Sequence, residues 1–206
     1  VMAVALLTKR KEIDAKRVFL LGHSLGGMLI PRIAERSPEV KGFISLAGST
    51  RPLEESVLMQ VKYLSNLDGK IDDDEAKAIA HIEKHIALVK SKDLTLTTSS
   101  ADLPLGVPAS YWLDLRGYDP AERAKQLPRP MLILQGERDY QVTMDDFAAW
   151  KKSLEGRKDV AFKTYPQLNH LFQAGEGKSM PGEYAQPGHV AEEVVRDIAD
   201  WVGRQK

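Results

Sequence analysis

Cysteine is missing from the 206 residues of this sequence. Its absence excludes disulfides, cysteine-ligated zinc and a thiol nucleophile, but it leaves the cellular compartment open because a cysteine-free chain is compatible with any redox environment. An excess of charge is missing as well, since 29 Lys and Arg residues balance 29 Asp and Glu residues. With no overall field to attract polyanions, we expect neither a nucleic-acid partner nor a membrane surface as a partner.

Long apolar runs are also missing. No stretch approaches the length needed to cross a bilayer, and the longest weakly charged stretch, residues 94–113, is rich in Thr, Ser and Pro. The segment Val1–Leu7 is apolar but lacks the basic start and the small-residue cleavage site of a signal peptide. We therefore expect a soluble protein, with cytoplasmic and secreted locations both open, whose true N-terminus lies upstream of Val1.

Short aliphatic runs predict four buried parallel strands. They are Val18–Leu21, Gly42–Leu46, Met131–Gln135 and Val160–Tyr165. Helical patterns follow three of these runs, at Leu25–Arg36, Met144–Leu154 and Val190–Val202, the last with an apolar stripe of Val190, Val194, Val195, Ile198 and Trp201. Strands that alternate with helices indicate an α/β fold, and the length of the chain suits a single domain over residues 1–206.

A long insertion separates the second predicted strand from the third. It covers about residues 50–128 and is partly helical in pattern, so we interpret it as a cap. Acidic residues at 72–75 suit the start of a helix, and Ile79, Ile82, Ile86 and Val89 would form one face of that helix. A second excursion, rich in Pro and Gly, covers residues 175–188 before the last helix.

Residues 22–27, Gly-His-Ser-Leu-Gly-Gly, directly follow the first predicted strand and precede a helical pattern. A G-x-S-x-G sequence between a strand and a helix is typical of a nucleophile elbow, in which the serine occupies a strained corner. The glycines on either side are expected because a side chain there would collide with the neighbouring strand or helix. The motif predicts Ser24 as a nucleophile.

A serine hydroxyl needs an imidazole to take its proton and a carboxylate to orient that imidazole. Of the five histidines, His23 lies inside the elbow and is expected to point away from the reactive side of Ser24, while His81 and His85 lie on the predicted cap helix. His170 follows the last strand in a short loop that would reach the carboxyl edge of the sheet near Ser24. We favour His170 as the base over His189, which lies next to the final helix.

The carboxylate is assigned in the same way. Asp139 leaves the carboxyl end of the third strand in a tight turn that contains glycine, and it is the favoured acid. Its competitors are Glu137, expected inside the turn, and Asp145 and Asp146, which suit the first turn of the next helix. Ser24, Asp139 and His170 occur along the chain in the order that one serine-hydrolase architecture uses. The two other well-known serine-triad folds place the serine last.

The chain resembles the carboxyl-terminal two-thirds of an α/β-hydrolase. The resemblance is carried by residues 22–27, by Leu134–Asp139 and by Asn169–His170, and it spans almost the whole chain. Within that superfamily the sequence is similar to bacterial carboxylesterases and to serine aminopeptidase or dipeptidyl-peptidase-like hydrolases. The resemblance implies a mostly parallel sheet flanked by helices with a helical cap, in which the N-terminal strands of the usual sheet are absent from this chain.

That absence has two implied consequences. An oxyanion hole uses two backbone amides, and Leu25 N–H supplies one, while the second has no visible source upstream of Ser24. The strand Val18–Leu21 would also have an open apolar edge, which is a template for pairing with another chain. We therefore expect either a separate N-terminal fragment bound at this edge or self-association through it.

Several further side chains are candidates for a substrate pocket. They are His23, Tyr111, Trp112, Tyr118, Tyr140 and Phe172. Aromatic side chains suit either a pocket or a core, and both readings stay open here. His81 and His85 are four residues apart as in helical zinc sites, but no third ligand can be named, so we expect no metal and no cofactor.

Taken together, these residues predict ester hydrolysis through an acyl-enzyme, on a small-molecule substrate. One alternative is cleavage of short peptides or amides by the same residues. Another is a non-catalytic fragment that needs a separate N-terminal piece to be active.

Overall fold

Four parallel strands form one sheet, in the order β1 (Phe19–His23), β2 (Gly42–Leu46), β3 (Met131–Gly136) and β4 (Val160–Tyr165). The computed structural model describes residues 1–205. β2 and β4 have the predicted bounds, whereas β1 continues to His23 because Gly22 and His23 still pair with Ser45 and Leu46 of β2. The strand therefore leads directly into Ser24.

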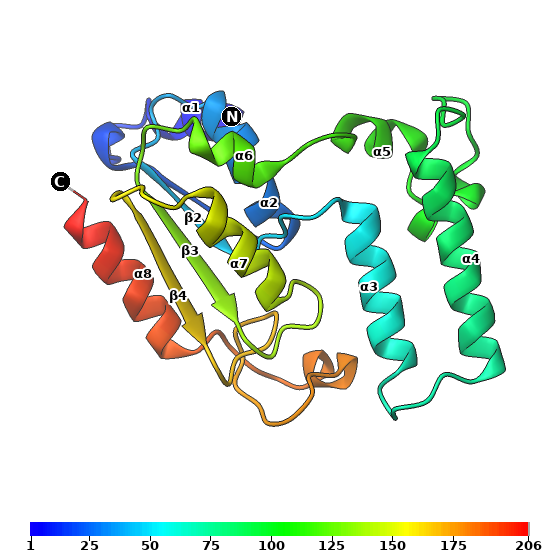
Figure 1. The fold of residues 1–206 in the computed structure, drawn as a ribbon. Helices are drawn as coiled ribbons and strands as arrows, with labels where there is room; N and C mark the ends of the chain where they lie inside the picture. The colour runs from blue at the N-terminus through cyan, green and yellow to red at the C-terminus, as the bar shows by residue number, and fades with distance from the viewer. Residues whose placement is uncertain (206) are drawn as a thin grey trace. The chain divides into compact units, whose positions relative to one another are not determined.

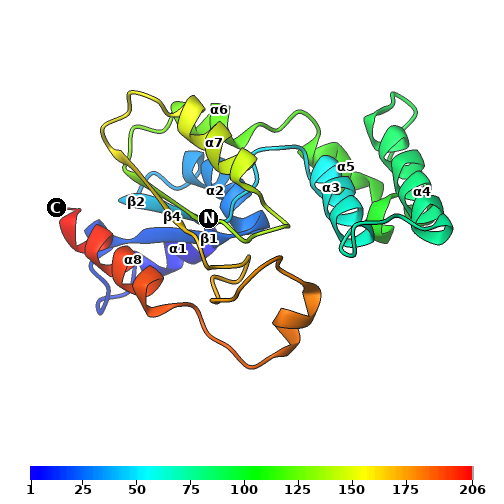
Figure 2. The ribbon, with the colours of Figure 1, turned by 60° about the horizontal axis from the view of Figure 1, so that its bottom comes forward.

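Helices cover both faces of the sheet (Figures 1 and 2). One face carries α2 (Leu25–Glu35), α6 (Pro120–Lys125) and α7 (Met144–Ser153), and the opposite face carries α8 (Glu192–Arg204). Successive strand residues face opposite ways. Accordingly, Phe43 belongs to the core under α2, α6 and α7, and Ile44 belongs to the core under α8.

The last helix differs from its prediction. Val190 lies before α8 begins, and Val195 is 56% exposed, so neither belongs to the buried stripe. Val194 and Trp201 are buried and Ile198 packs against the same core, at the helical spacing i, i+4, i+7. The helix starts at Glu192, later than predicted, after Ala191 N–H has bonded to the carbonyl of Phe172.

β1 lies at the edge of the sheet. Among residues 1–205 it pairs with β2 and with no other strand, and Leu21 at its centre is 52% exposed. The chain before it contains α1 (Met2–Leu7) and a short 3-10 turn, Ala15–Arg17. Val4 of α1 is buried in the core beneath α2, so this segment packs on the sheet domain.

Residues 51–118 form a second unit. It contains α3 (Leu53–Ser65), α4 (Asp73–Lys90), two 3-10 turns at Ser100–Asp102 and Pro104–Gly106, and α5 (Ala109–Leu115). Asp72 caps α4 by accepting hydrogen bonds from the N–H groups of Asp74 and Glu75, as the acidic cluster predicts. The first unit resumes at Asp119, earlier than residue 128, because Ala121 and Ala124 of α6 are buried in the core beneath α2.

Within the part of the chain that the structure describes, no helix combines the length and the apolar character needed to span a bilayer.

Candidate active site

Ser24 stands at the corner between β1 and α2, in a backbone conformation that few L-residues adopt. Its φ is 54° and its ψ is −120°. Two hydrogen bonds hold the corner: Ser24 N–H donates to the carbonyl of Leu46 at 2.9 Å, and Met28 N–H donates to the carbonyl of Ser24 at 2.9 Å. Such strain costs about 1–3 kcal/mol and persists where the surroundings enforce it. This is the geometry that the sequence motif predicts.

The glycines of the motif have different reasons to be there. A Cβ at Gly22 would lie 2.3 Å from the carbonyl oxygen of Gly26, and a Cβ at Gly27 would lie 2.8 Å from Ser45 Oγ. A Cβ at Gly26 would meet no atom within 4 Å, so the expected collision is wrong for that flank. Gly26 contributes the carbonyl oxygen with which a side chain at Gly22 would collide. Among residues 1–205, Ser45 Oγ is buried under the elbow and has no hydrogen-bond partner.

Asp139 follows β3 and is 5% exposed. Its Oδ1 accepts hydrogen bonds from the N–H groups of Gln141 (2.8 Å) and Val142 (3.0 Å). Its Oδ2 accepts from Gln135 Nε2 (3.1 Å) and lies 2.7 Å from His170 Nδ1. Two bonds to each oxygen fix the carboxylate in one orientation, aimed at His170.

The competing carboxylates point elsewhere. Glu137 accepts a hydrogen bond of 2.6 Å from Thr164 Oγ1 on β4. Asp145 is exposed. Asp146 is 1% exposed and binds the chain just after β2: its Oδ1 accepts from Ser49 Oγ (3.1 Å), Thr50 N–H (2.9 Å) and Thr50 Oγ1 (3.0 Å). Its position in the first turn of α7 is as expected, and its Oδ2 accepts there from Thr143 N–H at 3.1 Å, but Oδ1 binds the chain just after β2.

His170 lies in the turn after β4 and is 4% exposed. The turn is closed by Asn169, whose Oδ1 accepts hydrogen bonds from the N–H groups of Leu171 (3.0 Å) and Gln173 (3.1 Å). Phe172 in the same turn has a positive φ of 56°. Because His170 Nδ1 donates to Asp139, Nε2 is the nitrogen that remains to accept a proton. His189 is exposed on the later excursion.

His23 packs against His170. Its ring centroid lies 4.6 Å from that of His170, and its Nε2 lies 2.7 Å from the His170 carbonyl oxygen. Burial is the main cause that lowers the pKa of His23, so the ring is neutral near pH 7. A carbonyl only accepts, and Nε2–H is therefore the donor. His23 holds the backbone of the turn that carries His170.

The other pocket candidates divide between the two units. Phe172 is buried in the core under α8, and together with His23 it lines a hollow of about 370 Å³ next to β1. Tyr140 stacks on Tyr184, with centroids 6.3 Å apart. In the second unit, Trp112 is 2% exposed and its indole N–H donates to the carbonyl of Val107 at 3.2 Å, so it belongs to that unit's core.

Tyr111 and Tyr118 lie in the second unit as well. Tyr111 contacts the edge of Trp112 with ring centroids 6.1 Å apart, and burial is the main cause that raises its pKa. Tyr118 borders a hollow of about 180 Å³ whose other walls include Trp112 and Leu115. A pocket role for these tyrosines stays a prediction.

Leu25 is the first residue of α2. The first N–H groups of a helix have no acceptor within the helix, and the positive end of the helix dipole lies there. A role for the backbone N–H of Leu25 in binding a developing oxyanion stays a prediction.

The family model described as serine aminopeptidase, S33, matches residues 2–177. The chain belongs to this family. Esterase EstD of Thermotoga maritima is 45% identical to the chain over 200 residues, which cover 97% of this chain and 45% of that protein. The chain therefore spans less than half the length of this relative.

Solved structures place the S33 chain in the α/β-hydrolase fold. The esterase Pf2001 of Pyrococcus furiosus matches with a TM-score of 0.59 at 12% identity, covering 98% of this chain and 59% of that one. A second crystal form of the same esterase matches with a TM-score of 0.54. The resemblance inferred from the sequence motifs is confirmed at the level of the family and the fold.

Residues around the site that sequence reasoning missed are all polar and buried or half-buried. Gln135 binds Asp139, Asn169 closes the His170 turn, and Glu183 binds Asn169 at 2.9 Å. Asn169 and Gln135 adjoin the loops that carry the predicted acid and base, and a polar residue at the end of an apolar strand was the available signal. Nothing local marks Glu183.

Proposed function

We propose that the protein containing this chain is a serine hydrolase that cleaves carboxylic esters, with Ser24, His170 and Asp139 as its triad. The observation that carries the proposal is the contact of 2.7 Å between His170 Nδ1 and Asp139 Oδ2, on the same edge of the sheet as the strained Ser24. The name of its relative, Esterase EstD, supports an ester as the bond that is cleaved.

The proposed reaction has two halves. Ser24 Oγ attacks the ester carbonyl while His170 Nε2 takes the hydroxyl proton, and Asp139 stabilises the imidazolium that forms. Leu25 N–H holds the oxyanion. His170 then gives the proton to the leaving alcohol, and water, activated by the same imidazole, hydrolyses the acyl-enzyme.

Peptide or amide hydrolysis is the second candidate, because the chain matches the serine aminopeptidase family. The same three residues would act, with an amine as the leaving group. Comparison of aryl esters with aminoacyl amides, using the full-length protein, separates the two. A larger kcat/KM for the amides would reject the ester proposal.

Replacement of the triad tests the mechanism. Ser24→Ala is expected to abolish labelling by a fluorophosphonate and to lower kcat about 10⁵-fold or more, and Asp139→Asn is expected to lower kcat about 10⁴-fold. Asp145→Asn, an exposed aspartate six residues away, is the matched control and should leave kcat unchanged. Labelling of Ser24 that His170→Ala does not slow would mean that no triad operates.

We also propose that the open side of β1 pairs with another strand, from an N-terminal part of the same protein or from a second copy. The exposed Leu21 and the absence of a second partner for β1 among residues 1–205 support this. Such a strand is also the expected source of the second oxyanion donor. A monomer of this chain alone, seen by native mass spectrometry and labelled at Ser24 at full rate, would count against it.

A further inference from the structure

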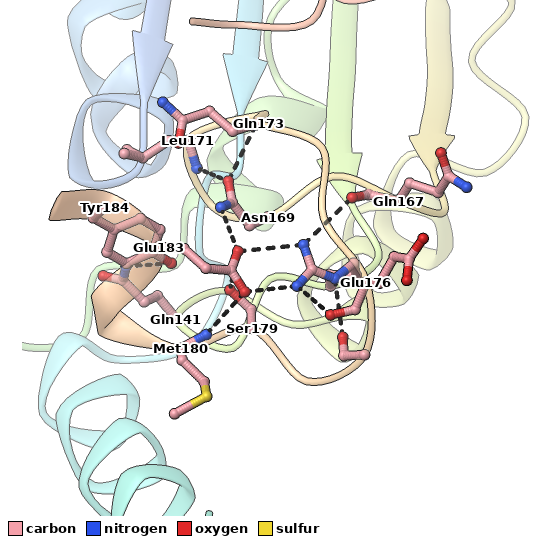
Figure 3. A network of polar contacts seen from close by, with 12 residues as sticks. Gln141, Gln167, Asn169, Leu171, Gln173, Glu176, Ser179, Met180, Glu183 and Tyr184 are labelled. Carbon is pink, nitrogen blue, oxygen red and sulfur yellow. Dashed lines mark hydrogen bonds and ion pairs between the residues drawn. The ribbon is translucent and has the colours of Figure 1, made fainter. Parts of the chain in front are cut away.

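Two residues, Arg138 and Asn169, bind the carboxylate of Glu183. Figure 3 shows the Asn169 and Glu183 side chains of this network. Arg138 directly precedes Asp139 in the chain, and Asn169 directly precedes His170. Glu183 Oε1 accepts a hydrogen bond from Arg138 Nη2 at 2.6 Å, and Glu183 Oε2 accepts from Arg138 Nη1 at 3.3 Å and from Asn169 Nδ2 at 2.9 Å. One side chain thus binds the neighbours of both the acid and the base.

Glu183 comes from a third part of the chain. It lies in the 3-10 helix Pro181–Ala185, within the excursion before α8. Its carboxylate also accepts from Met180 N–H at 3.3 Å and from Ser179 Oγ at 3.5 Å. Burial acts to raise the pKa of Glu183, but the hydrogen bonds from Arg138 and Asn169 outweigh it, so the pKa lies below its ordinary value. Glu183 is therefore an anion at neutral pH.

The Arg138 guanidinium has no freedom to turn away from this carboxylate. Its side chain is 8% exposed. Besides Glu183 it donates to the carbonyls of Gly177 (2.9 Å) and Glu176 (3.0 Å). A bidentate pair of this kind fixes direction as well as distance. The excursion is thereby tied to the residue next to Asp139.

Asn169 uses both ends of its side-chain amide. Its Oδ1 holds the N–H groups of Leu171 and Gln173, and its Nδ2 binds Glu183. It is 1% exposed, so water cannot easily replace a lost partner. Without Glu183 the amide would lose the acceptor that sets its orientation, and the turn around His170 would loosen.

The acid and base loops also touch directly. Arg138 N–H donates to the carbonyl of Leu168 at 3.0 Å. At Gly136 a Cβ would lie 2.4 Å from that same oxygen, so the two loops are as close as their backbones allow. Glu183 therefore binds two loops, those of Asp139 and His170, whose contact leaves little room for displacement.

We infer that Glu183 is a positioning residue: by binding Arg138 and Asn169 together, its carboxylate keeps Asp139 and His170 at hydrogen-bonding distance. The inference rests on the proposed function for its effect on turnover. Its effect on geometry does not depend on the substrate. Because Glu183 contacts neither Ser24 nor the pocket candidates His23 and Phe172 in any hydrogen bond that the described residues show, its loss should affect proton transfer and leave substrate binding intact.

The test compares Glu183→Gln and Glu183→Ala with Asp159→Asn in the full-length protein. Gln keeps an oxygen for Asn169 and removes the charge facing Arg138, whereas Ala removes both. Asp159 is the matched control: it pairs with Arg157 at 2.6 Å, and Arg157 also donates to the carbonyls of Ala124 and Arg129, but this pair lies at the opposite end of the sheet.

We expect the Glu183 variants to lower kcat about 10- to 100-fold, Ala more than Gln, with KM and the fold unchanged. The downfield proton resonance of His170 Nδ1–H, assigned by its loss in His170→Ala, should broaden or move in both variants. Asp159→Asn should reduce thermal stability and leave kcat and this resonance as they are.

Two results would overturn the inference: an unchanged resonance and kcat in Glu183→Gln, or a rise in KM with kcat preserved. If Glu183→Ala does not fold, the Gln variant decides. Failure of the proposed function looks different, because the parent protein would then show no Ser24 labelling while the resonance still responds to Glu183.

Discussion

At the carboxyl end of the sheet, two buried carboxylates hold backbone N–H groups of the loops, whereas at the amino end two arginines hold backbone carbonyls at the ends of helices. Asp139 and Asp146 illustrate the first arrangement, each accepting hydrogen bonds from backbone N–H groups of loops beyond the strands. Arg129 and Arg157 illustrate the second, donating to carbonyls at the ends of α2 and α6, namely Ala34 and Ala124. Cationic groups suit the negative ends of helices.

Backbone strain follows the same division. Ser24, Ala47 and Phe172 are the non-glycine residues of the sheet unit with positive φ, at 54°, 47° and 56°, and all three follow the carboxyl ends of strands. Within residues 1–205 the amino end of the sheet has no such residue. The amino end of the sheet therefore contributes to stability, whereas the carboxyl end holds strained backbone conformations at the place where we expect the chemistry.

Glycine replacement gives the strongest contrast between the two ends. Gly136→Ala would place a Cβ 2.4 Å from the carbonyl of Leu168 and 2.8 Å from that of Asn169, in the backbone that carries His170. We expect a loss of about 1–3 kcal/mol in the free energy of unfolding and a fall in kcat of about a hundredfold. Urea unfolding and steady-state kinetics measure the two effects.

The counterpart at the amino end is Gly42→Ala. Its Cβ would lie 2.9 Å from the far end of the Trp201 side chain and 3.1 Å from the carbonyl of Pro130. We expect reduced stability, with kcat per folded molecule unchanged, because neither neighbour belongs to the site. An equal fall in kcat in both variants would mean that the two ends are not separable.

Arg129→Met measures how much the amino end of the sheet contributes to the stability of the folded protein. The guanidinium donates to the carbonyls of Ser37 (2.7 Å), Val40 (3.1 Å) and Ala34 (2.7 Å), and it lies 4.6 Å from the ring centroid of Phe43. Removing the guanidinium takes a donor from each carbonyl, although Ala34 and Ser37 keep backbone donors, and should cost about 2–4 kcal/mol in the free energy of unfolding. A variant that unfolds at the same urea concentration as the parent would contradict this.

The smallest expected effect is on acid stability. The pKa of Asp159 is lowered chiefly by its hydrogen bond with Arg157, and that of Glu183 lies below its ordinary value despite burial. Such carboxylates stabilise the folded state fully above their ordinary pKa values, 3.8 and 4.5, and less as the pH falls through the lowered values. Asp159→Asn and Glu183→Gln should each flatten the fall of melting temperature with acid.

Both effects on acid stability should be modest because both pairs are partly exposed to solvent. Melting curves recorded across the acid range provide the measurement. A parent protein whose melting temperature rises on acidification would reverse the expected sign.

Much of the sheet unit was predictable because its signals are local. β2 and β4 are short runs of mainly apolar residues, and the elbow combines a strand, a motif and a helix within about 20 residues. Asp139 and His170 were found because the carboxyl ends of parallel strands share one edge, which brings their loops together. Their catalytic roles stay predictions for the kinetic tests above.

The remainder depends on contacts that no local pattern encodes. Arg138 and Glu183 are 45 residues apart, and their meeting depends on the path of a Pro- and Gly-containing excursion. The predicted apolar stripe of α8 included two residues too many, because Val190 and Val195 are apolar but not buried. The burial of Asp146 was missed because its partners lie 96 and 97 residues away, at the end of β2.

Asp146 has a consequence for modularity. Its carboxylate accepts hydrogen bonds from Ser49 and Thr50, the last residues before the second unit begins at Arg51. A few residues earlier, Leu46 presents the carbonyl that holds the amide of Ser24. These hydrogen bonds lie between Leu46 and Arg51, so we expect changes within residues 51–118 to leave the backbone of the elbow unaltered.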